Sequence, residues 1–287
     1  MASNQETLRA FLWYALYGQA MTARSIGSGV ISLGLVSIPF KVYVAAASQN
    51  VEFNLLHKRC GGRMKQAYHC HVCVSPGDQN DSVTVERSEM VKGFEFAKDQ
   101  YVQFSEEDLK KLESPKIDSL EIVEFVPVST VSLVYIDKSY YIGPDKGAER
   151  SYLLFTQAMG EKGVVAVGKY WTRGRLQLVV IEPHMSGDKI GLVMHYMHYA
   201  NEVRSFEEVA VTDTGDFKKI ELELAYQLIK QLSSEAFAPE KYRDEYQDRV
   251  REAVDQKITG REIVLSEEEP KPAILDLYEA LKRSVSH

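Results

Sequence analysis

The sequence has few cysteines and few tryptophans, three and two respectively in 287 residues. All three cysteines lie between positions 60 and 73, and an odd, clustered set makes a poor disulfide framework but a better metal site. No apolar run approaches the roughly 18 residues that a membrane-spanning helix needs. These shortages exclude a disulfide scaffold and a helical membrane protein, and they favour a reducing, cytoplasmic setting.

A secretory signal peptide is not predicted either. The apolar run at 11–17 is at the short limit for the core of such a peptide, and Glu6 and Arg9, which precede it, cancel each other's charge. The positively charged region that a signal peptide carries is therefore missing. We interpret residues 1–22 as an N-terminal extension of a cytoplasmic protein.

The net charge is −7, from 34 lysines and arginines against 41 aspartates and glutamates. That total argues against a nucleic-acid binder, whose footprint is normally basic. The charge is segregated along the chain, however. Basic residues outnumber acidic ones in 21–75 and 146–206, and acidic residues prevail in 76–145 and 207–287. We therefore expect a basic surface built from two segments.

Apolar residues make up 45% of the chain, enough for a sizeable core. The first 200 residues are rich in β-branched and aromatic residues, which favour strands. The strands predicted at 164–171, 175–182 and 189–199 have the spacing of a meander. Pro127 interrupts the strand predicted at 119–136. The predicted strands are 30–45, 119–136, 140–147, 164–171, 175–182 and 189–199.

Helical patterns dominate the last third of the chain. Ser105, followed by acidic residues and then lysines, predicts a short capped helix at 104–113, and another helix is expected at 151–161. The remaining predicted helices are 217–233, 239–258 and 272–285. The fold class is therefore α+β, mainly β, with a β-rich core followed by a helical arm.

A cluster of histidine and cysteine predicts a metal site. It has the pattern H-x2-C, nine residues, C-x2-C, formed by His57, Cys60, Cys70 and Cys73. A two-residue gap lets both ligands of a pair face one tetrahedral ion, and four protein ligands leave no open position for water. We therefore predict structural zinc, with His69 and His71 as competitors for the fourth position. The alternative is three free thiols in a hairpin.

No catalytic constellation is convincing. The stretch GVVAVGK at 163–169 resembles a phosphate-binding loop, but Tyr170 stands where that motif needs Ser or Thr, and VVAV is a strand pattern. The zinc deaminase pattern fails as well, because no Glu follows a His at the required spacing. We predict that the protein is not an enzyme.

The turn WTRGR at 171–175 carries two arginines between predicted strands. Arg173 and Arg175 project from it, and guanidinium groups suit phosphate oxygens. A solvated turn is the plainer interpretation. Further cations in the same basic segments support the phosphate-binding one, namely Arg63, Lys65, Lys146 and Lys169.

The chain resembles the bacterial and phage Ku proteins, which bind DNA double-strand ends in non-homologous end joining. The resemblance runs over 23–285 and rests on about a dozen segments in order. They include ISLGLVSIPFKVY (31–43), LLHKRCGGR (55–63), CHVC (70–73), VKGFEFAKDQYVQFSEEDL (91–109), YYIGPDKGAERSYLL (140–154), RGR (173–175), YANEVR (199–204), ELELAYQLIKQL (221–232) and PEKYRDEYQDRV (239–250).

This resemblance implies a β-barrel core, a bridge that encircles DNA and an arm that embraces a second subunit. Such a homodimeric ring reads the DNA backbone and not its sequence, as expected of a site made of Lys and Arg. The zinc cluster would belong to a zinc-ribbon-like part of the bridge. The residues expected at the DNA are Arg173, Arg175, Arg63, Lys65, Lys58, Arg59, Lys146 and Lys169.

The resemblance also implies a partner for the C-terminal segment. In the family this segment recruits the end-joining DNA ligase, and the amphipathic pattern at 272–285 matches a tethered helix. The residues expected to contact the ligase are Ile274, Leu277, Tyr278 and Leu281. No ATPase or nuclease activity is expected, and the location would be the cytoplasm in association with the nucleoid.

The expected domain organisation follows from these parts. Residues 1–22 form an extension, and 23–206 form the barrel core with its bridge and an insert at about 55–76. Residues 207–262 form the dimerisation arm, and 263–287 form a linker and the partner-binding helix. Two other functions stay open, a zinc-dependent hydrolase and an adaptor that binds proteins only.

Overall fold

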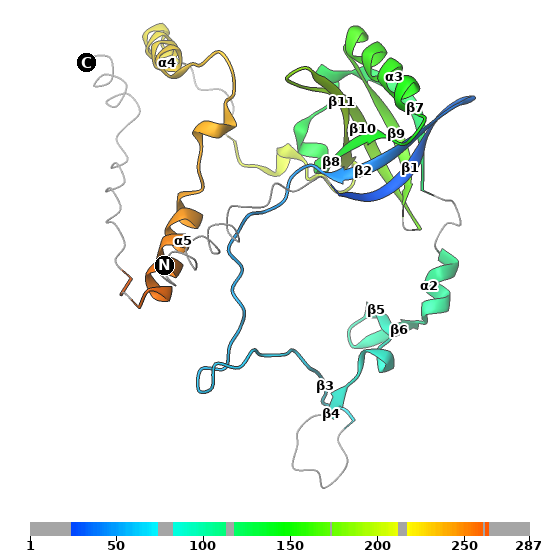
Figure 1. Ribbon diagram of the computed structural model, residues 1–287, viewed down its shortest axis with the longest axis vertical. Coiled ribbons are helices and arrows are strands. Elements are labelled where there is room, and N and C mark those ends of the chain that lie inside the picture. Colours follow the sequence, from blue (N-terminus) through cyan, green and yellow to red (C-terminus); the bar gives the residue numbers. More distant parts are fainter. Residues whose placement is uncertain are drawn as a thin grey trace, which may run out of the picture. The chain divides into compact units, whose positions relative to one another are not determined.

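The computed structural model describes residues 24–73, 83–112, 118–172, 174–211, 217–260 and 262–263 (Figure 1). The predicted N-terminal extension, Arg173 and the predicted C-terminal helix lie outside these residues. The described chain divides into two compact units, the first made of 24–48 with 65–204 and the second of 49–64 with the residues from 205 on. One boundary therefore falls inside the predicted insert at 55–76.

A closed barrel forms the core of the first unit (Figure 1). The strand order is β1-β2-β8-β11-β10-β9-β7, and all neighbours are antiparallel except β7 and β1, which close the barrel in parallel. The strands are β1 (Ser25–Leu33), β2 (Val36–Val44), β7 (Ser119–Pro127), β8 (Ile136–Pro144), β9 (Val164–Thr172), β10 (Arg175–Ser186) and β11 (Lys189–Met197). The barrel confirms the predicted, mainly β fold class.

Alternating strand positions fill the interior of the barrel. In a closed sheet, side chains point inward and outward by turns, so every second residue of a strand reaches the core. The most deeply buried side chains are at most 1% exposed and include Ile31, Phe40, Leu120, Ile181 and Leu192. This packing explains why β-branched and aromatic residues dominate the first 200 positions.

Two predicted strands are longer than the strands in the structure. The stretch 30–45 is a hairpin and not a single strand, because Gly34 turns the chain with φ of +58°, a conformation that glycine adopts readily. Beyond Pro127 the chain leaves the sheet and forms 3-10 turns at Val128–Thr130 and Leu133–Tyr135. Within 128–135, Val131 and Tyr135 pack against buried side chains on the outer barrel wall, whereas Val128, Leu133 and Val134 are exposed.

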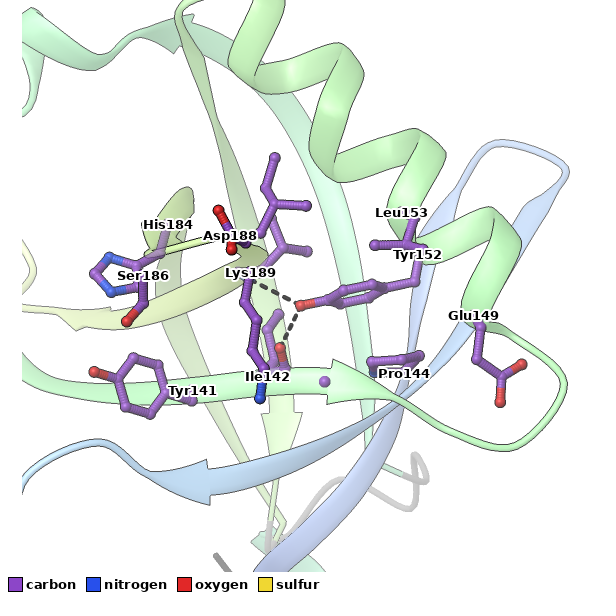
Figure 2. Close-up of a pocket in the computed structure, with 14 residues that line it drawn as sticks. Tyr141, Ile142, Pro144, Glu149, Tyr152, Leu153, His184, Ser186, Asp188 and Lys189 are labelled. Carbon is purple, nitrogen blue, oxygen red and sulfur yellow. Dashed lines mark hydrogen bonds between the residues drawn. The ribbon is translucent and has the colours of Figure 1, made fainter.

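Helix α3 (Glu149–Lys162) confirms the helix predicted at 151–161 and is pinned to the barrel by one tyrosine. The Tyr152 hydroxyl donates to the Ile142 carbonyl at 2.6 Å and accepts from the Leu192 amide at 2.8 Å. Ile142 and Leu192 are cross-strand partners on β8 and β11, so the hydroxyl is inserted into their ladder (Figure 2). Burial raises the pKa of Tyr152.

The first unit also contains small elements outside the barrel. Helix α2 (Glu106–Leu112) confirms the predicted capped helix, since the Ser105 hydroxyl accepts from the Asp108 amide at 3.1 Å. Two short hairpins were not predicted, and their strands are β3 (Tyr68–Cys70), β4 (Val83–Val85), β5 (Lys92–Ala97) and β6 (Gln100–Phe104).

The second unit holds the helical arm. Helix α4 (Lys219–Leu232) matches the predicted helix at 217–233. Helix α5 (Glu245–Ile258) begins six residues later than predicted, because the Asp244 carboxylate caps it by accepting from the Gln247 amide at 3.0 Å. Among the described helices, none is long and apolar enough to cross a membrane.

Candidate nucleic-acid interface and metal-binding pairs

The first predicted metal pair lies in a tight loop of the second unit. Leu56 and Arg63 form an isolated antiparallel bridge that closes this loop, and Gly61 turns it with φ of +69°. The His57 amide donates to the Gly62 carbonyl at 2.8 Å. Within the loop, His57 Nδ1 lies 3.1 Å from Cys60 Sγ, so the two side chains face each other.

The second pair lies at the end of β3 in the first unit. Cys70 Sγ and Cys73 Sγ are 3.5 Å apart. The backbone N–H groups of Val72 and Cys73 point at the Cys70 sulfur and lower the pKa of that thiol, which favours the metal-binding thiolate. The competing His69 is engaged elsewhere, because its Nδ1 lies 3.4 Å from the Thr84 hydroxyl across the β3–β4 ladder.

The Cys70–Cys73 pair has a sulfur separation that suits zinc. Two thiolates on a tetrahedral zinc with bonds of roughly 2.3 Å lie about 3.8 Å apart, close to the separation of the Cys70 and Cys73 sulfurs. Within the described residues, however, no three His, Cys, Asp or Glu side chains gather at one point. The structure therefore contains two preformed pairs in two units, and the single four-ligand site stays a prediction.

The loop at 55–64 that carries His57 and Cys60 is also basic. Lys58, Arg59 and Arg63 are all exposed on it, and Lys65 is exposed where the chain enters the first unit. The loop is held by backbone hydrogen bonds, so these cations project from a fixed turn. Such side chains suit phosphate oxygens, which fix register but carry no sequence information.

Lys169 and Arg175 do not share a face of the barrel. Lys169 lies opposite Leu178 in the β9–β10 ladder, and Leu178 packs on the outer wall. Arg175 lies opposite Thr172, and both line a cavity of about 430 Å³ at one end of the barrel. These two predicted DNA-contact residues are therefore apart, with Lys169 on the outer wall and Arg175 at the rim.

Lys146 lies in the loop before α3, beside an ion pair. Its side chain is exposed, and its amide donates to Asp145 Oδ1 at 2.7 Å. The same carboxylate lies 3.0 Å from Lys41 Nζ. The hydrogen bond from Lys41 lowers the pKa of Asp145, and Asp145 raises the pKa of Lys41. Lys41 is thus neutralised locally, which leaves Lys146 as the cation offered to solvent.

Sequence reasoning missed Lys138. It lines the same end cavity as Arg175, together with Gln177 and the partly or fully buried rings of Tyr140, Tyr170 and Tyr196. Its ammonium is 3.9 Å from Asp137. Charge reasoning passed over it because Lys138 falls in the acidic segment 76–145, and strand register alone brings it to the rim.

A second cavity, of about 710 Å³, lies where α3 meets β8 and the β10–β11 hairpin (Figure 2). Figure 2 shows Tyr152 and Leu153 on its helix side, with the paired rings of Tyr141 and His184 across from them, 5.7 Å apart between centroids. None of the four predicted metal ligands lines this cavity. It therefore gives no support to a zinc-dependent hydrolase.

Ser139, His195 and Glu182 form a chain of side-chain contacts across three neighbouring strands of the barrel. His195 Nδ1 lies 2.8 Å from the Ser139 hydroxyl, and His195 Nε2 lies 3.3 Å from Glu182 Oε2. These residues come from the antiparallel strands β8, β11 and β10, whose N–H groups bond within the sheet plane. Nucleophilic catalysis also needs N–H donors aimed at a developing oxyanion, and a regular ladder aims none there.

The sequence is similar to that of known proteins over most of its length. A family model described as the Ku70/Ku80 beta-barrel domain matches residues 32–224. A Paraburkholderia phymatum protein named non-homologous end joining protein Ku is 39% identical over 270 residues, covering 92% of this chain and 83% of its own. Proteins of the same name from Archaeoglobus fulgidus and Koribacter versatilis are 37% and 35% identical, with 98% and 86% of their lengths covered.

The match and the fold agree with each other. The matched residues begin at the end of β1, contain the other six strands of the barrel and extend into α4. The relatives are covered over most of their length, so the likeness extends to the helical arm and is not confined to one motif. The chain therefore belongs to the Ku family of non-homologous end joining proteins.

Proposed function

We propose that the protein binds double-stranded DNA ends as a homodimeric ring, independently of base sequence, and brings the end-joining ligase to them. The observation that carries this proposal is the exposed apolar face of α4. None of its 14 residues is buried in the chain. The apolar side chains of Leu222, Tyr226 and Ile229 are 40%, 64% and 61% exposed. A helix with an apolar stripe needs a partner surface, and a second copy supplies one that is self-complementary.

The DNA contacts would come from fixed, exposed cations. Lys58, Arg59 and Arg63 project from the tight loop of the second unit, and Arg175 stands at the rim of the barrel. These groups are placed on turns and strand ends and not along a helix that could enter the major groove. They therefore suit contacts to phosphates, whose energy does not depend on the bases.

Zinc would have a structural role and not a catalytic one. The predicted ligands His57, Cys60, Cys70 and Cys73 would complete a tetrahedral set with no open position. Elemental analysis of protein purified without added zinc tests this. About one equivalent per chain supports the site, and less than half an equivalent contradicts it.

The ligase would be bound by the C-terminal segment at 274–281. Its apolar residues recur at the spacing of one helical face, as expected of a helix that docks in a partner's groove. Deleting 266–287 should leave DNA-end binding intact and abolish ligase recruitment. Loss of both activities would point to a different role for this segment.

One gel-shift experiment tests the central proposal. The protein is titrated onto a linear duplex and onto a closed circular duplex of the same sequence. Only the linear form has an end onto which a ring can thread, so binding to it alone is expected. Equal affinity for both forms would overturn the proposal. Turnover of nucleic acid during the same incubations would favour the hydrolase instead, and no binding to either would favour the protein-only adaptor.

A further inference from the structure

Helix α5 holds the backbone of the segment that precedes the basic loop at 55–64. The Val51 amide donates to Gln247 Oε1 at 2.8 Å, and Arg251 Nη2 donates to the Gln49 carbonyl at 3.1 Å. Both partners belong to the second unit, although they are about 200 residues apart in the chain. We call residues 49–51 the stem, because they lead from the barrel toward the loop at 55–64.

The spacing of these contacts on the two sides matches. Gln247 and Arg251 are four residues apart, so they lie on one face of α5. Gln49 and Val51 are two residues apart, the interval at which an extended chain presents its C=O and N–H groups on the same side. The helix therefore binds the stem much as one β-strand binds another. One of its side chains accepts a hydrogen bond from the stem and the other donates one to it.

Both residues have further hydrogen bonds within α5 besides their contacts with the stem. Gln247 is buried, with only 8% of its surface exposed, and its backbone N–H donates to the carboxylate of the capping residue Asp244. The Arg251 side chain is 22% exposed, and its Nη1 donates to Asp248 at 3.1 Å while Nη2 reaches the stem. Such preorganised groups bind with little further loss of side-chain entropy.

We propose that Gln247 and Arg251 are positioning residues for DNA-end binding, because they fix the stem and with it the loop that carries Lys58, Arg59 and Arg63. The proposal rests on the proposed function, in which these cations contact DNA. A loop whose stem is free must lose conformational entropy when it binds, whereas a held stem has already lost it. The arm thereby does more than join two subunits.

Amide hydrogen exchange tests the grip without DNA. In the intact chain, the Val51 amide should exchange slowly, and Gln247→Ala with Arg251→Ala should speed its exchange about tenfold or more, as for an amide released from a local contact. Gln247→Glu keeps an acceptor oxygen and should restore protection. Gln256→Ala is the matched control, because its amide donates to Glu252 on the same helix. Unchanged Val51 exchange in the double variant would overturn the grip.

Dissociation from DNA tests the positioning role. The double variant should leave a preloaded linear duplex about three- to tenfold faster than the unaltered chain, in the range that interface changes usually move dissociation rates, while its dimer content and melting temperature stay unchanged. Faster Val51 exchange with unaltered DNA dissociation would overturn the positioning role. If the unaltered chain did not bind linear DNA, the proposed function would fail, and the exchange result would still decide whether α5 holds the stem.

Discussion

At the scale of single residues, Tyr152 shows how one hydroxyl joins a helix to a sheet. It replaces a direct bond between the cross-strand partners Ile142 and Leu192. Tyr152→Phe leaves the Leu192 amide and the Ile142 carbonyl without this partner in a buried place, so we expect a loss of roughly 1–3 kcal/mol in the free energy of unfolding. Urea denaturation measures it.

The control for this change is another tyrosine of the same region. Tyr141 is 42% exposed on the outer wall, and Tyr141→Phe should change stability by less than about 0.5 kcal/mol. An equal effect of both changes would contradict the role assigned to the Tyr152 hydroxyl. The comparison also separates the hydroxyl from the ring, because both variants keep their rings.

The Lys41–Asp145 pair makes a prediction about pH. The Lys41 hydrogen bond holds the pKa of Asp145 below its ordinary 3.8, and Asp145 holds the pKa of Lys41 above its ordinary 10.5. In a carboxyl-carbon NMR titration, Lys41→Met should raise the pKa of Asp145. Lys146→Gln should raise it less, because the backbone N–H of residue 146 remains. The reverse order would contradict the assigned causes.

The sign of the resulting stability change follows from linkage. The contribution of Asp145 is complete above its unfolded pKa and is lost as the pH falls through the lower folded-state value. The contribution of Lys41 is complete below pH 10.5 and is lost as the pH rises through the higher folded-state value. Between these limits the pair contributes a constant amount, reduced by its partial exposure.

At the scale of elements, α4 provides a test of the proposed dimer. Leu222, Tyr226 and Ile229 follow the i, i+4, i+7 spacing of one helix face. Tyr226→Asp with Ile229→Asp places two charges where a partner would cover them, and we expect the dimer dissociation constant to rise on the order of 100-fold. Sedimentation velocity measures the change, and Glu223→Gln serves as the control. A dimer that survives the double change would place the interface elsewhere.

The sequence predicted most of the barrel but not all of its surroundings. Strands such as β9 and β10 were found because each contains a run of β-branched and other apolar residues, VVAV at 164–167 and LVVI at 178–181. The turn at Gly34 was missed, since a run of apolar residues on both sides hides a turn that depends on one backbone angle. The β5–β6 hairpin was missed because its residues are all partly or fully exposed and show no buried face.

The candidate site was predictable as a set of residues but not as an arrangement. The spacing of His57 with Cys60 and of Cys70 with Cys73 predicted two pairs, and each pair is formed. Their division between two units depends on contacts between 49–64 and the arm, such as that of Val51 with Gln247. No local pattern encodes a contact between residues so far apart in the chain.

At the scale of the whole molecule, binding to DNA should depend steeply on salt. Each phosphate neutralised by the basic loops releases counterions, so the logarithm of the binding constant should fall with the logarithm of the salt concentration, with a slope of about −0.9 per phosphate. Arg173→Glu with Arg175→Glu should weaken binding to all sequences alike and reduce that slope. Fluorescence anisotropy on two duplexes of unrelated sequence measures both effects. A loss confined to one sequence would contradict backbone recognition.

The parallel closure of the barrel has a consequence for folding. Strand β1 lies between β2 and β7, and the chain leaves β2 at Val44 and returns to β7 only at Ser119. Joining the ends of so long a connection costs about 4 kcal/mol in loop entropy, whereas the β9–β10–β11 meander closes through short turns. Contacts between distant parts of a chain therefore form late.

We accordingly expect the β1–β2 hairpin to pair with β7 and β8 last. In pulse-labelled hydrogen exchange during refolding, amides in the β1–β7 ladder around Ile31 and Leu120 should gain protection after those of β10 and β11. Simultaneous protection would contradict this order. The connection between β2 and β7 carries several of the proposed DNA-binding residues. The same connection thus also delays completion of the barrel.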